Sequence, residues 1–453
     1  MDLKNKRVLV VGLGKSGVSA ALYLRRLGAR VTVSDTRAGE ALAKEIPALL
    51  DAGVMVETGG HGVLTFRRQD LIVVSPGVPL STPEIQQVMA FGMPLIGEVE
   101  LAFQGLLGKV IAITGSNGKT TTTSLVGHIL AHAGLERKVG GNIGLPVVEL
   151  VEGSTEKTWS VLEVSSFQLE TIDTFRPHIA AVLNITPDHL DRHGSFENYA
   201  ASKARITENQ TSGDFLVLNA EDKSTQMVAA KTKAQIYWFS GVRRVKQGAF
   251  VHGDGVYFLA KEGGTPEPVM PVSEIPLPGA HNVENVLAAI AMARLAGVSA
   301  EVVREAVGSF TAVEHRLQFV RQVRGVAYYN DSKATNVDAT AKALASFASG
   351  VRVILGGKDK GSDYTLLVPL LKERTVAVYT IGAAASIIAS QIGEDVVLTP
   401  AGTLAEAVRL ASLTAKAGET VLLAPACASF DQFTSYEHRG RVFVELVEAL
   451  RGD

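Results

Sequence analysis

The chain has 453 residues, of which 46% are hydrophobic and 20% charged, with a formal net charge of −2. This composition is typical of globular proteins, and the length predicts about three domains of roughly 150 residues each. The charge argues against a nucleic-acid-binding protein, which needs concentrated Lys and Arg. No apolar run approaches the ~20 residues needed to cross a membrane. With Cys427 as the single cysteine, we expect a cytoplasmic protein without disulfides that binds neither nucleic acid nor membrane.

The first part of the chain alternates strand-like and helix-like segments. RVLVVGLG (7–14), RVTVSD (30–35) and LIVVSPGV (71–78) are apolar and β-branched, and SGVSAALYLRRLG (16–28) has helical spacing. Such β–α repeats predict a parallel sheet with right-handed crossovers. The pattern ends near residue 97, so we expect a Rossmann-like first domain over 1–97.

A glycine-rich turn in this first domain predicts a phosphate-bearing ligand. Gly12, Gly14 and Gly17 form G-x-G-x-x-G between a strand and a helix, and Asp35 ends the next strand. This arrangement is typical of dinucleotide binding, with the diphosphate at the helix N-terminus and the acid on a ribose hydroxyl. The residues alone favour a nicotinamide enzyme, but a UDP-linked substrate meets the same needs. A turn without a ligand is the third interpretation.

The segment TGSNGKTTTT (114–123) is the most informative of the chain. It follows the apolar strand KVIAI (109–113) and precedes SLVGHILAHAG (124–134), which has helical spacing. A strand, a Gly-rich turn and a helix N-terminus hold anionic oxygens through backbone N–H groups. Lys119 would add a charge to the β- and γ-phosphates, and Thr120 a hydroxyl ligand for Mg²⁺.

Further polar residues follow the next strands of this central, P-loop-type domain. Glu163 ends a buried strand, and a carboxylate at the carboxyl edge of a sheet is a plausible Mg²⁺ ligand beside Thr120. His189 lies in the polar loop NITPDHLDRHGS (184–195), where it would bind a metal or phosphate or simply be exposed. Lys203 is expected on a helix over 196–209 with Ser195 as its N-cap. Spacing alone gives Lys203 no role, because an ammonium cannot bind Mg²⁺.

The chain then leads into a third β/α domain. Residues 236–278 are rich in Gly and Pro with short β-like runs, which predicts an antiparallel excursion. A long helix over 280–297 follows, and SFTAVEHRLQFV (309–320) crosses into the last domain. We therefore expect a central domain over 98–312 and a Rossmann-like domain over 313–453. The fold class is α/β, with three mainly parallel sheets flanked by helices.

Three loops of the last domain follow strands and are rich in small, charged and hydroxyl residues. They are NDSKATN (330–336), GGKDKGSD (356–363) and PACASFDQF (425–433). Because strand ends meet at one edge of a parallel sheet, we expect these loops to face one ligand.

These blocks, in this order, resemble the Mur ligase family of peptidoglycan synthesis. The resemblance runs from Gly12 to Tyr436, and TGSNGKT, LEVSSFQLE, NITPDHLDRH, LPGAHNVEN, EHR and NDSKATN carry it. NDSKATN together with PACASFDQF points to the branch of the family that adds D-glutamate. The resemblance implies an ATP-dependent, amide-forming ligase that extends UDP-N-acetylmuramoyl-L-alanine through an acyl phosphate. It further implies a role in cell-wall biogenesis, cell shape and cell division, and we expect a monomer.

The resemblance also implies site residues. Lys119, Glu163, His189 and Lys203 would be catalytic, and two Mg²⁺ ions would be held by Thr120, Glu163, His189 and a carbamylated Lys203. Carbamylation would turn the lysine into an anionic oxygen ligand. ATP would contact Gly115, Ser116, Asn117, Gly118, Lys119, Thr120, Thr121, Asn142, Asn285, Arg316 and Asp331. The uridine diphosphate end would contact Gly14, Lys15, Ser16, Asp35, Thr36, Arg37, Ser75 and Gly77. D-glutamate would face Lys333, Thr335, Lys360, Ser429 and Tyr436.

Three other functions compete with this interpretation. A dehydrogenase rests on GLGKSG (12–17) with Asp35. A folylpolyglutamate-type ligase would share the ATP chemistry, but the N-terminal GLGKSG domain argues against it. A nucleotide-gated binding module would bind ATP without turnover, and the dense polar loops on two domains make that improbable.

Overall fold

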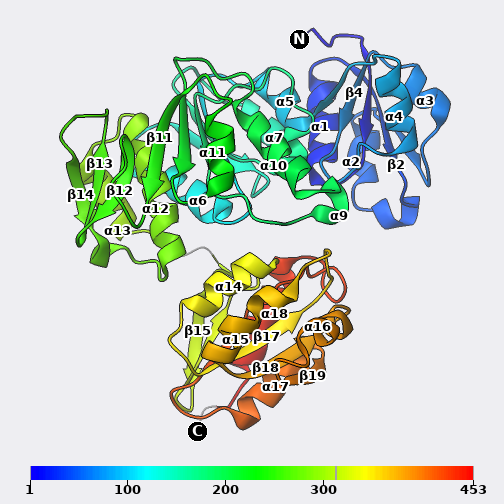
Figure 1. Ribbon diagram of the computed structural model, residues 1–453. Coiled ribbons are helices and arrows are strands. Elements are labelled where there is room, and N and C mark those ends of the chain that lie inside the picture. Colours follow the sequence, from blue (N-terminus) through cyan, green and yellow to red (C-terminus); the bar gives the residue numbers. More distant parts are fainter. Residues whose placement is uncertain (1, 312–313, 452–453) are drawn as a thin grey trace.

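The computed structural model describes residues 2–311 and 314–451, and it contains three sheets flanked by helices (Figure 1). This three-domain α/β architecture agrees with the fold class expected from the sequence. The predicted boundary at 97 lies between a strand ending at Gly97 and a helix beginning at Glu98. The predicted boundary between 312 and 313 lies outside the described residues. Both domain boundaries stay predictions.

The first sheet is parallel, with the strand order β3-β2-β1-β4-β5. Its strands are β1 (Arg7–Val11), β2 (Arg30–Asp35), β3 (Met55–Thr58), β4 (Leu71–Val74) and β5 (Leu95–Gly97). The flanking helices are α1 (Lys15–Arg26), α2 (Ile46–Asp51), α3 (Val63–Arg67) and α4 (Pro83–Ala90). The strand order reverses between β1 and β4, and such switch points are where open α/β sheets bind ligands.

The glycine turn after β1 is closely packed. A Cβ on Gly17 would lie 1.9 Å from the Gly12 carbonyl oxygen and 2.6 Å from Ser75 Oγ. Only glycine fits there, because α1 must start directly against the end of β4.

The second sheet has nine strands in the order β14-β13-β12-β11-β10-β9-β6-β8-β7. The first seven in the chain are β6 (Lys109–Thr114), β7 (Arg137–Gly141), β8 (Trp159–Glu163), β9 (Ile179–Val182), β10 (Phe215–Asn219), β11 (Gln235–Ser240) and β12 (Gly248–His252). β13 (Gly255–Leu259) and β14 (Glu267–Pro271) extend it in antiparallel fashion. This confirms the antiparallel excursion predicted for residues 236–278, although its first strand, β11, pairs in parallel with both neighbours.

The longer helices flank the second sheet, and the first of them begins at the phosphate turn. They are α6 (Lys119–His132), α10 (Phe196–Ala204), α11 (Lys223–Ala229), α12 (Ala280–Leu295) and α13 (Ala300–Gly308). The short ones are α5 (Glu98–Phe103), α7 (Val147–Val151), α8 (Ser166–Leu169) and α9 (Leu190–His193). Ser195 caps α10 as predicted, but the helix ends at Ala204 and continues as a 3-10 turn over Arg205–Thr207 instead of running to 209.

The first two domains share one apolar core. It contains Val8 and Val10 of β1, Val99 of α5, Val148 of α7 and Val110 of β6. A Cβ on the last residue of β5 would collide with a side chain of the second domain. We infer that these two domains move as one body, because separating them would expose this core to water.

The third sheet has the order β15-β16-β20-β17-β18-β19, with β15 antiparallel to β16 and the rest parallel. Its strands are β15 (Gln318–Val323), β16 (Val326–Asn330), β17 (Val351–Gly356), β18 (Thr375–Ile381), β19 (Leu398–Gly402) and β20 (Thr420–Leu423). Its helices are α14 (Val337–Ala345), α15 (Val368–Arg374), α16 (Ala385–Ile392), α17 (Leu404–Thr414) and α18 (Tyr436–Glu448). Helix α14 lies on the side that faces the second domain (Figure 1). Among the helices of the described residues, none has the length and apolarity to cross a membrane.

Candidate active site

The phosphate turn lies between β6 and α6, as the sequence predicts. Gly118 directly precedes α6 with φ +85°, a left-handed conformation that favours glycine. A Cβ there would also lie 2.2 Å from Asn285 Oδ1 of α12. The turn is therefore packed against α12, and the N-terminus of α6 is the positive end of a helix dipole.

Two lysines converge on the same carbonyl oxygen of this turn. Lys119 Nζ donates to the carbonyl oxygens of Gly115 and Ser116, both at 2.8 Å. Lys203 Nζ, from α10, also donates to the Gly115 carbonyl at 2.8 Å, and Lys203 is 2% exposed. Burial lowers the pKa of Lys119, and burial together with the neighbouring Lys119 lowers the pKa of Lys203 well below its usual value. Burial therefore disfavours the charged form of both lysines.

A buried carboxylate lies beside the turn. Glu163 at the end of β8 is 1% exposed, and its two oxygens accept from Thr120 Oγ1 and Asn142 Nδ2, each at 2.8 Å. Gly141, at the end of β7, lies close to the backbone of Glu163. With its φ of +107°, a Cβ on Gly141 would lie 2.2 Å from the Glu163 carbonyl oxygen. Both groups that donate to the Glu163 carboxylate are neutral, so its negative charge is available to bind a cation.

One cavity opens on the outer side of the turn, between the second and third domains. Its volume is about 50 Å³. It is lined by Asn117, Gly118, Asn184, His281, Asn282, Glu284, Asn285, Arg316, Leu317, Asp331, Lys333, Ala334, Ala339 and Lys342. Arg316 Nε is buried and, within the described part of the chain, lacks a hydrogen-bond partner. Burial raises the pKa of Asp331 to about 7 and lowers that of Arg316. An unpartnered guanidinium nitrogen favours an anionic ligand in this cavity.

A second cavity, of about 290 Å³, lies on the other side of the turn. It is lined by Lys119, Asn142, Ser165, Ser166, Phe167, Asp188, His189, Tyr199, Lys203, Thr335, Lys360, Ala428, Ser429, Phe430 and Tyr436. His189 has an unusual left-handed backbone for a non-glycine residue, with φ +53°. Burial lowers the pKa of His189 to about 4, so its imidazole is neutral near pH 7 and has a lone pair for a ligand.

The residues that the resemblance assigned to D-glutamate divide between the two cavities. Thr335, Lys360, Ser429 and Tyr436 line the larger one, and Lys333 lines the smaller one. Lys333 Nζ nevertheless lies 3.7 Å from the centre of the Tyr436 ring. Lys360 Nζ is paired with Asp188 Oδ1 at 3.2 Å. Any ligand of Lys360 must therefore share it with this carboxylate.

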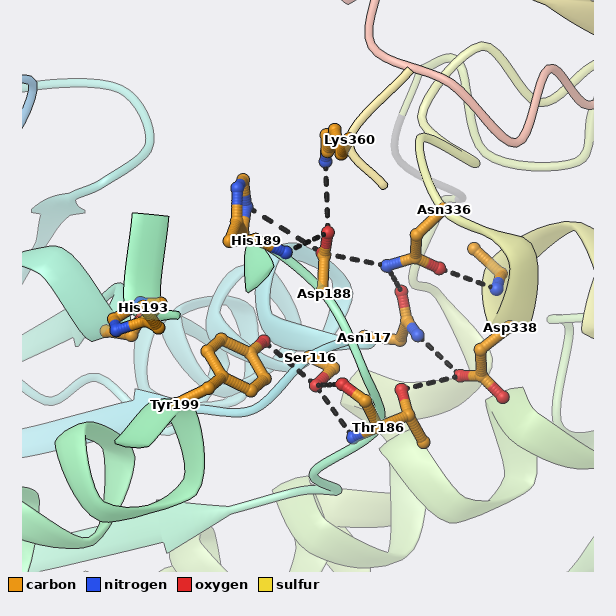
Figure 2. A network of polar contacts seen from close by, with 12 residues as sticks. Ser116, Asn117, Thr186, Asp188, His189, His193, Tyr199, Asn336, Asp338 and Lys360 are labelled. Carbon is orange, nitrogen blue, oxygen red and sulfur yellow. Dashed lines mark hydrogen bonds and ion pairs between the residues drawn. The ribbon is translucent and has the colours of Figure 1, made fainter. Parts of the chain in front are cut away.

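Polar groups join the second and third domains at the phosphate turn (Figure 2). Asp338 accepts a hydrogen bond from Asn117 at 2.5 Å and one from Thr186 at 3.3 Å. Asn336 donates to Asp188 at 2.9 Å. The two domains are thus in contact around the site, with the cavities between them.

The residues expected at the uridine diphosphate end lie together at the carboxyl edge of the first sheet. Gly14, Lys15 and Ser16 are at the start of α1, Asp35 ends β2 and precedes Thr36 and Arg37, and Ser75 and Gly77 follow β4. Several are already held by protein groups. The Asp35 carboxylate accepts from the Leu13 N–H at 2.7 Å and from the Arg37 guanidinium at 2.8 Å. Burial opposes this charge, yet the hydrogen bonds and Arg37 lower the pKa of Asp35 to about 2. Asp35 therefore orders the turn after β1 in this structure.

Sequence reasoning missed several residues of the two cavities. Asp188, Tyr199 and Phe167 line the larger cavity, and Lys342 the smaller one. Asp188 lies in the polar loop 184–195 and is 8% exposed at its side chain, so the local density of polar residues could have pointed to it. Tyr199 bonds to Ser116 Oγ at 2.9 Å from a neighbouring helix, which no local pattern reveals.

Family models cover most of the chain. Residues 6–97 match "Mur ligase MurD-like, N-terminal domain", residues 113–293 match "Mur ligase middle domain", and residues 315–427 match "Mur ligase, glutamate ligase domain". The chain belongs to the Mur ligase family, and it is an ATP-dependent ligase.

Its relatives are named UDP-N-acetylmuramoylalanine–D-glutamate ligase. The one from Acidobacterium capsulatum is 63% identical over 452 residues, covering 100% of this chain and 98% of that protein. The one from Koribacter versatilis is 58% identical and covers 99% of each. Among solved structures, the UDP-N-acetylmuramate–alanine ligase from Thermotoga maritima gives a TM-score of 0.61 at 20% identity, covering 98% of this chain and 100% of that one. The MurF ligase from Thermotoga maritima in complex with ADP gives 0.60 at 16% identity, covering 99% and 95%. These structures are similar in fold.

Proposed function

We propose that this protein joins D-glutamate to UDP-N-acetylmuramoyl-L-alanine at the expense of ATP, in the cytoplasmic stage of peptidoglycan precursor synthesis. The observation that carries the proposal is the 63% identity to a D-glutamate ligase over the whole chain. The two cavities on either side of one phosphate turn support it. A reaction between ATP and an acceptor carboxylate needs two binding sites that meet at the γ-phosphate.

The phosphate turn and the smaller cavity are proposed to bind ATP. The backbone of residues 115–118, the Lys119 ammonium and the first threonines of α6, Thr120 and Thr121, would cradle its phosphates. Asn285, Arg316 and Asp331 line the adjacent cavity, and the unpartnered Arg316 Nε supports an anionic ligand there. Asn142, on the other side of the turn, would contact the transferred phosphoryl group from the larger cavity.

The donor set around the phosphate turn fits Mg²⁺ only in part by itself. No cluster of three or more His, Cys, Asp and Glu residues arranged for a metal occurs among residues 2–311 and 314–451. Glu163 and the Thr120 hydroxyl provide hard oxygens 2.8 Å apart. His189, which lines the larger cavity, offers a neutral imidazole. A carbamylated Lys203 would add the second anionic ligand, and phosphate oxygens would complete the set. Bound there, Mg²⁺ would offset the negative charge that builds up as the two anions meet.

The proposed reaction forms two bonds in succession. The substrate carboxylate oxygen attacks the γ-phosphorus, the bond to the β,γ-bridging oxygen breaks, and ADP leaves with an acyl phosphate remaining. The amine of D-glutamate then attacks the acyl carbon, and inorganic phosphate leaves with the electron pair of the broken C–O bond. The amine loses a proton in forming the amide. Lys119 would stabilise the charge on the transferred phosphoryl group throughout.

D-glutamate and the acceptor would approach from opposite ends of the larger cavity. Thr335, Lys360, Ser429 and Tyr436 come from the third domain, and Lys333 reaches the ring of Tyr436. Two lysines and hydroxyl donors suit a dicarboxylate. The uridine diphosphate would lie at the edge of the first sheet, on Gly14, Lys15, Ser16, Asp35, Thr36, Arg37, Ser75 and Gly77. Because the shared core fixes that sheet to the second one, we expect the first two domains to act as a single platform in a monomer.

The test is phosphate release from ATP with UDP-N-acetylmuramoyl-L-alanine. Reactions containing D-glutamate, L-glutamate, D-alanine or no amino acid are compared. Turnover with D-glutamate alone is expected. If none of the amino acids supports turnover, the proposed reaction is wrong, and binding of NAD(P)H, judged by its fluorescence, would then favour the dehydrogenase interpretation.

A further inference from the structure

Asp338 in the first turn of α14 makes a concentrated set of contacts across the domain junction. Its Oδ2 atom accepts from Asn117 Nδ2 at 2.5 Å and from Thr186 Oγ1 at 3.3 Å (Figure 2). The same oxygen lies 2.9 Å from Lys342 Nζ, one helical turn further along α14. One carboxylate oxygen of the third domain thus contacts both the phosphate turn and the loop after β9.

Among the described residues, the hydrogen bonds of the Asn117 side chain go to the third domain. Its Nδ2 donates to Asp338, and its Oδ1 accepts from Asn336 at 3.4 Å. Its backbone is held by the second domain instead, because the Asn117 N–H donates to Asn184 Oδ1 at 2.8 Å and its carbonyl accepts from Asn184 Nδ2 at 3.1 Å. Asn117 therefore links the third domain, through its side chain, to the backbone of the phosphate turn, whose N–H groups form the cradle.

The charge of Asp338 is balanced locally. Its side chain is 28% exposed, and Lys342 neutralises it from the same helix. The hydrogen bonds from Asn117 and Thr186 are charge-assisted and stronger than bonds between neutral groups. Asp338 can therefore lie beside a phosphate-binding turn, because it presents a neutralised pair and not a free anion.

We propose that Asp338 is a positioning residue of the ligase, which holds α14 against the phosphate turn by orienting the Asn117 side chain. All partners in this contact are groups of the chain itself. The contact therefore stabilises the docked position of the third domain that this structure shows. The further consequence, that it sets the cradle for phosphoryl transfer, rests on the proposed function.

The direct test measures the distance between the two domains. Nitroxide labels on Lys233→Cys and Glu394→Cys, both at exposed positions, report this distance in the full chain by pulsed electron paramagnetic resonance. Native Cys427 is buried and is therefore protected from the label. Asp338→Ala is expected to lower the ratio of docked to undocked molecules about tenfold, the scale of one charge-assisted hydrogen bond. Asp338→Asn serves as a second variant that keeps the shape. Asp395→Ala is the matched control, because Asp395 forms an exposed pair with Lys372 in the same domain. Unchanged distance distributions in both Asp338 variants would overturn the proposal.

A double-mutant cycle tests whether Asp338 acts through Asn117. Asn117→Ala alone and combined with Asp338→Ala should shift the distance distribution by similar amounts, because both remove the same contact. Additive shifts would overturn the proposed route. In turnover assays, Asp338→Ala should raise the KM for ATP about tenfold while kcat falls less than threefold, because Asn117 belongs to the turn that would bind the ATP phosphates. If the unmodified chain has no ligase activity, the proposed function is wrong, but the distance measurements still test the role of Asp338. If the Asp338 variants keep normal activity and an unchanged distance distribution, the proposed role of Asp338 is wrong and the proposed function stands.

Discussion

Lys203 Nζ and Lys119 Nζ both donate to the carbonyl oxygen of Gly115 at 2.8 Å. Two amines therefore share one neutral acceptor in the interior of the second domain. Keeping both charged is costly, and the pKa of Lys203 accordingly falls well below its usual value through burial and the proximity of Lys119. A neutral amine can add to carbon dioxide, whereas an ammonium cannot. The resulting carbamate would be an anion beside Lys119 and would relieve the excess of positive charge.

Replacement of Lys203 by alanine is expected to abolish ligase activity, and short carboxylates should restore part of it. The added carboxylate would supply the anionic oxygens that a carbamate on Lys203 provides in the protein without the mutation. Carbon-13 spectra taken under labelled carbon dioxide should show a carbamate signal in the chain that carries Lys203 and none in Lys203→Ala. An active alanine variant without added carboxylate would leave Lys203 as an ordinary buried lysine.

Replacement of Lys119 by alanine should lower kcat by roughly 100-fold or more. Lys119 is the cation of the phosphate turn, and loss of a fixed group that stabilises transition-state charge costs about this much. Initial rates of phosphate release would measure the effect. Lys231→Ala, at an exposed lysine of the same domain, is the control and should retain full activity. Near-normal turnover of Lys119→Ala would contradict the assignment of residues 115–121 to phosphate.

The phosphate turn could be predicted from the sequence because all its parts are local. A strand, two glycines, Lys119, Thr120 and a helix follow one another without a gap, and each has a physical role at its own position. The same holds for the third-domain loops, since parallel strands bring their carboxyl ends to one edge. Ser195 was identifiable as an N-cap for the same reason.

Contacts between distant residues could not be predicted in this way. The approach of Asn285 to Gly118 joins positions more than 160 residues apart, and the pairing of Lys360 with Asp188 joins two domains. The sequence predicts Asp35 on a ribose hydroxyl, which stays a prediction, but it does not reveal that Arg37 and the Leu13 N–H also donate to this carboxylate. A motif identifies the residue types that a ligand needs, but it does not reveal which of them protein groups already engage.

The affinity for D-glutamate should fall as the pH rises above 8. Burial lowers the pKa of Lys333 from 10.5 to about 8, so its ammonium is present below that pH and is lost above it. If the ammonium binds a carboxylate of D-glutamate, the KM for D-glutamate should rise roughly tenfold between pH 7 and pH 9. Lys333→Gln should have a high KM that lacks this step. Tyr436→Phe keeps the ring 3.7 Å from the amine and should behave like the unmodified protein. The same pH step in Lys333→Gln would assign the titration to another group.

We expect the interface between the first two domains to become less stable at alkaline pH because Glu98, at the start of α5, loses its proton there. One of its oxygens accepts from the Val148 N–H at 2.8 Å, and the other is buried without a hydrogen-bond partner among the described residues. Burial raises the pKa of this carboxyl from 4.5 to about 7. The folded protein therefore holds a proton that the unfolded chain releases at about pH 4.5. The stability that this proton provides is complete below pH 4.5 and is lost as the pH rises through 7.

Glu98→Gln should remove this pH dependence, because the amide imitates the protonated acid. At pH 8 the free energy of unfolding of the joined first two domains should exceed that of the unmodified chain by about 3 kcal/mol at most. At pH 4.5 the two proteins should be nearly equal. Chemical denaturation at both pH values, followed through the transition of the first two domains, measures the difference. The exposed Glu394→Gln is the control and should follow the unmodified chain. An equal gain for Glu98→Gln at both pH values would show that its effect comes from packing, because only ionisation of a carboxyl whose pKa lies between them can make the gain depend on pH.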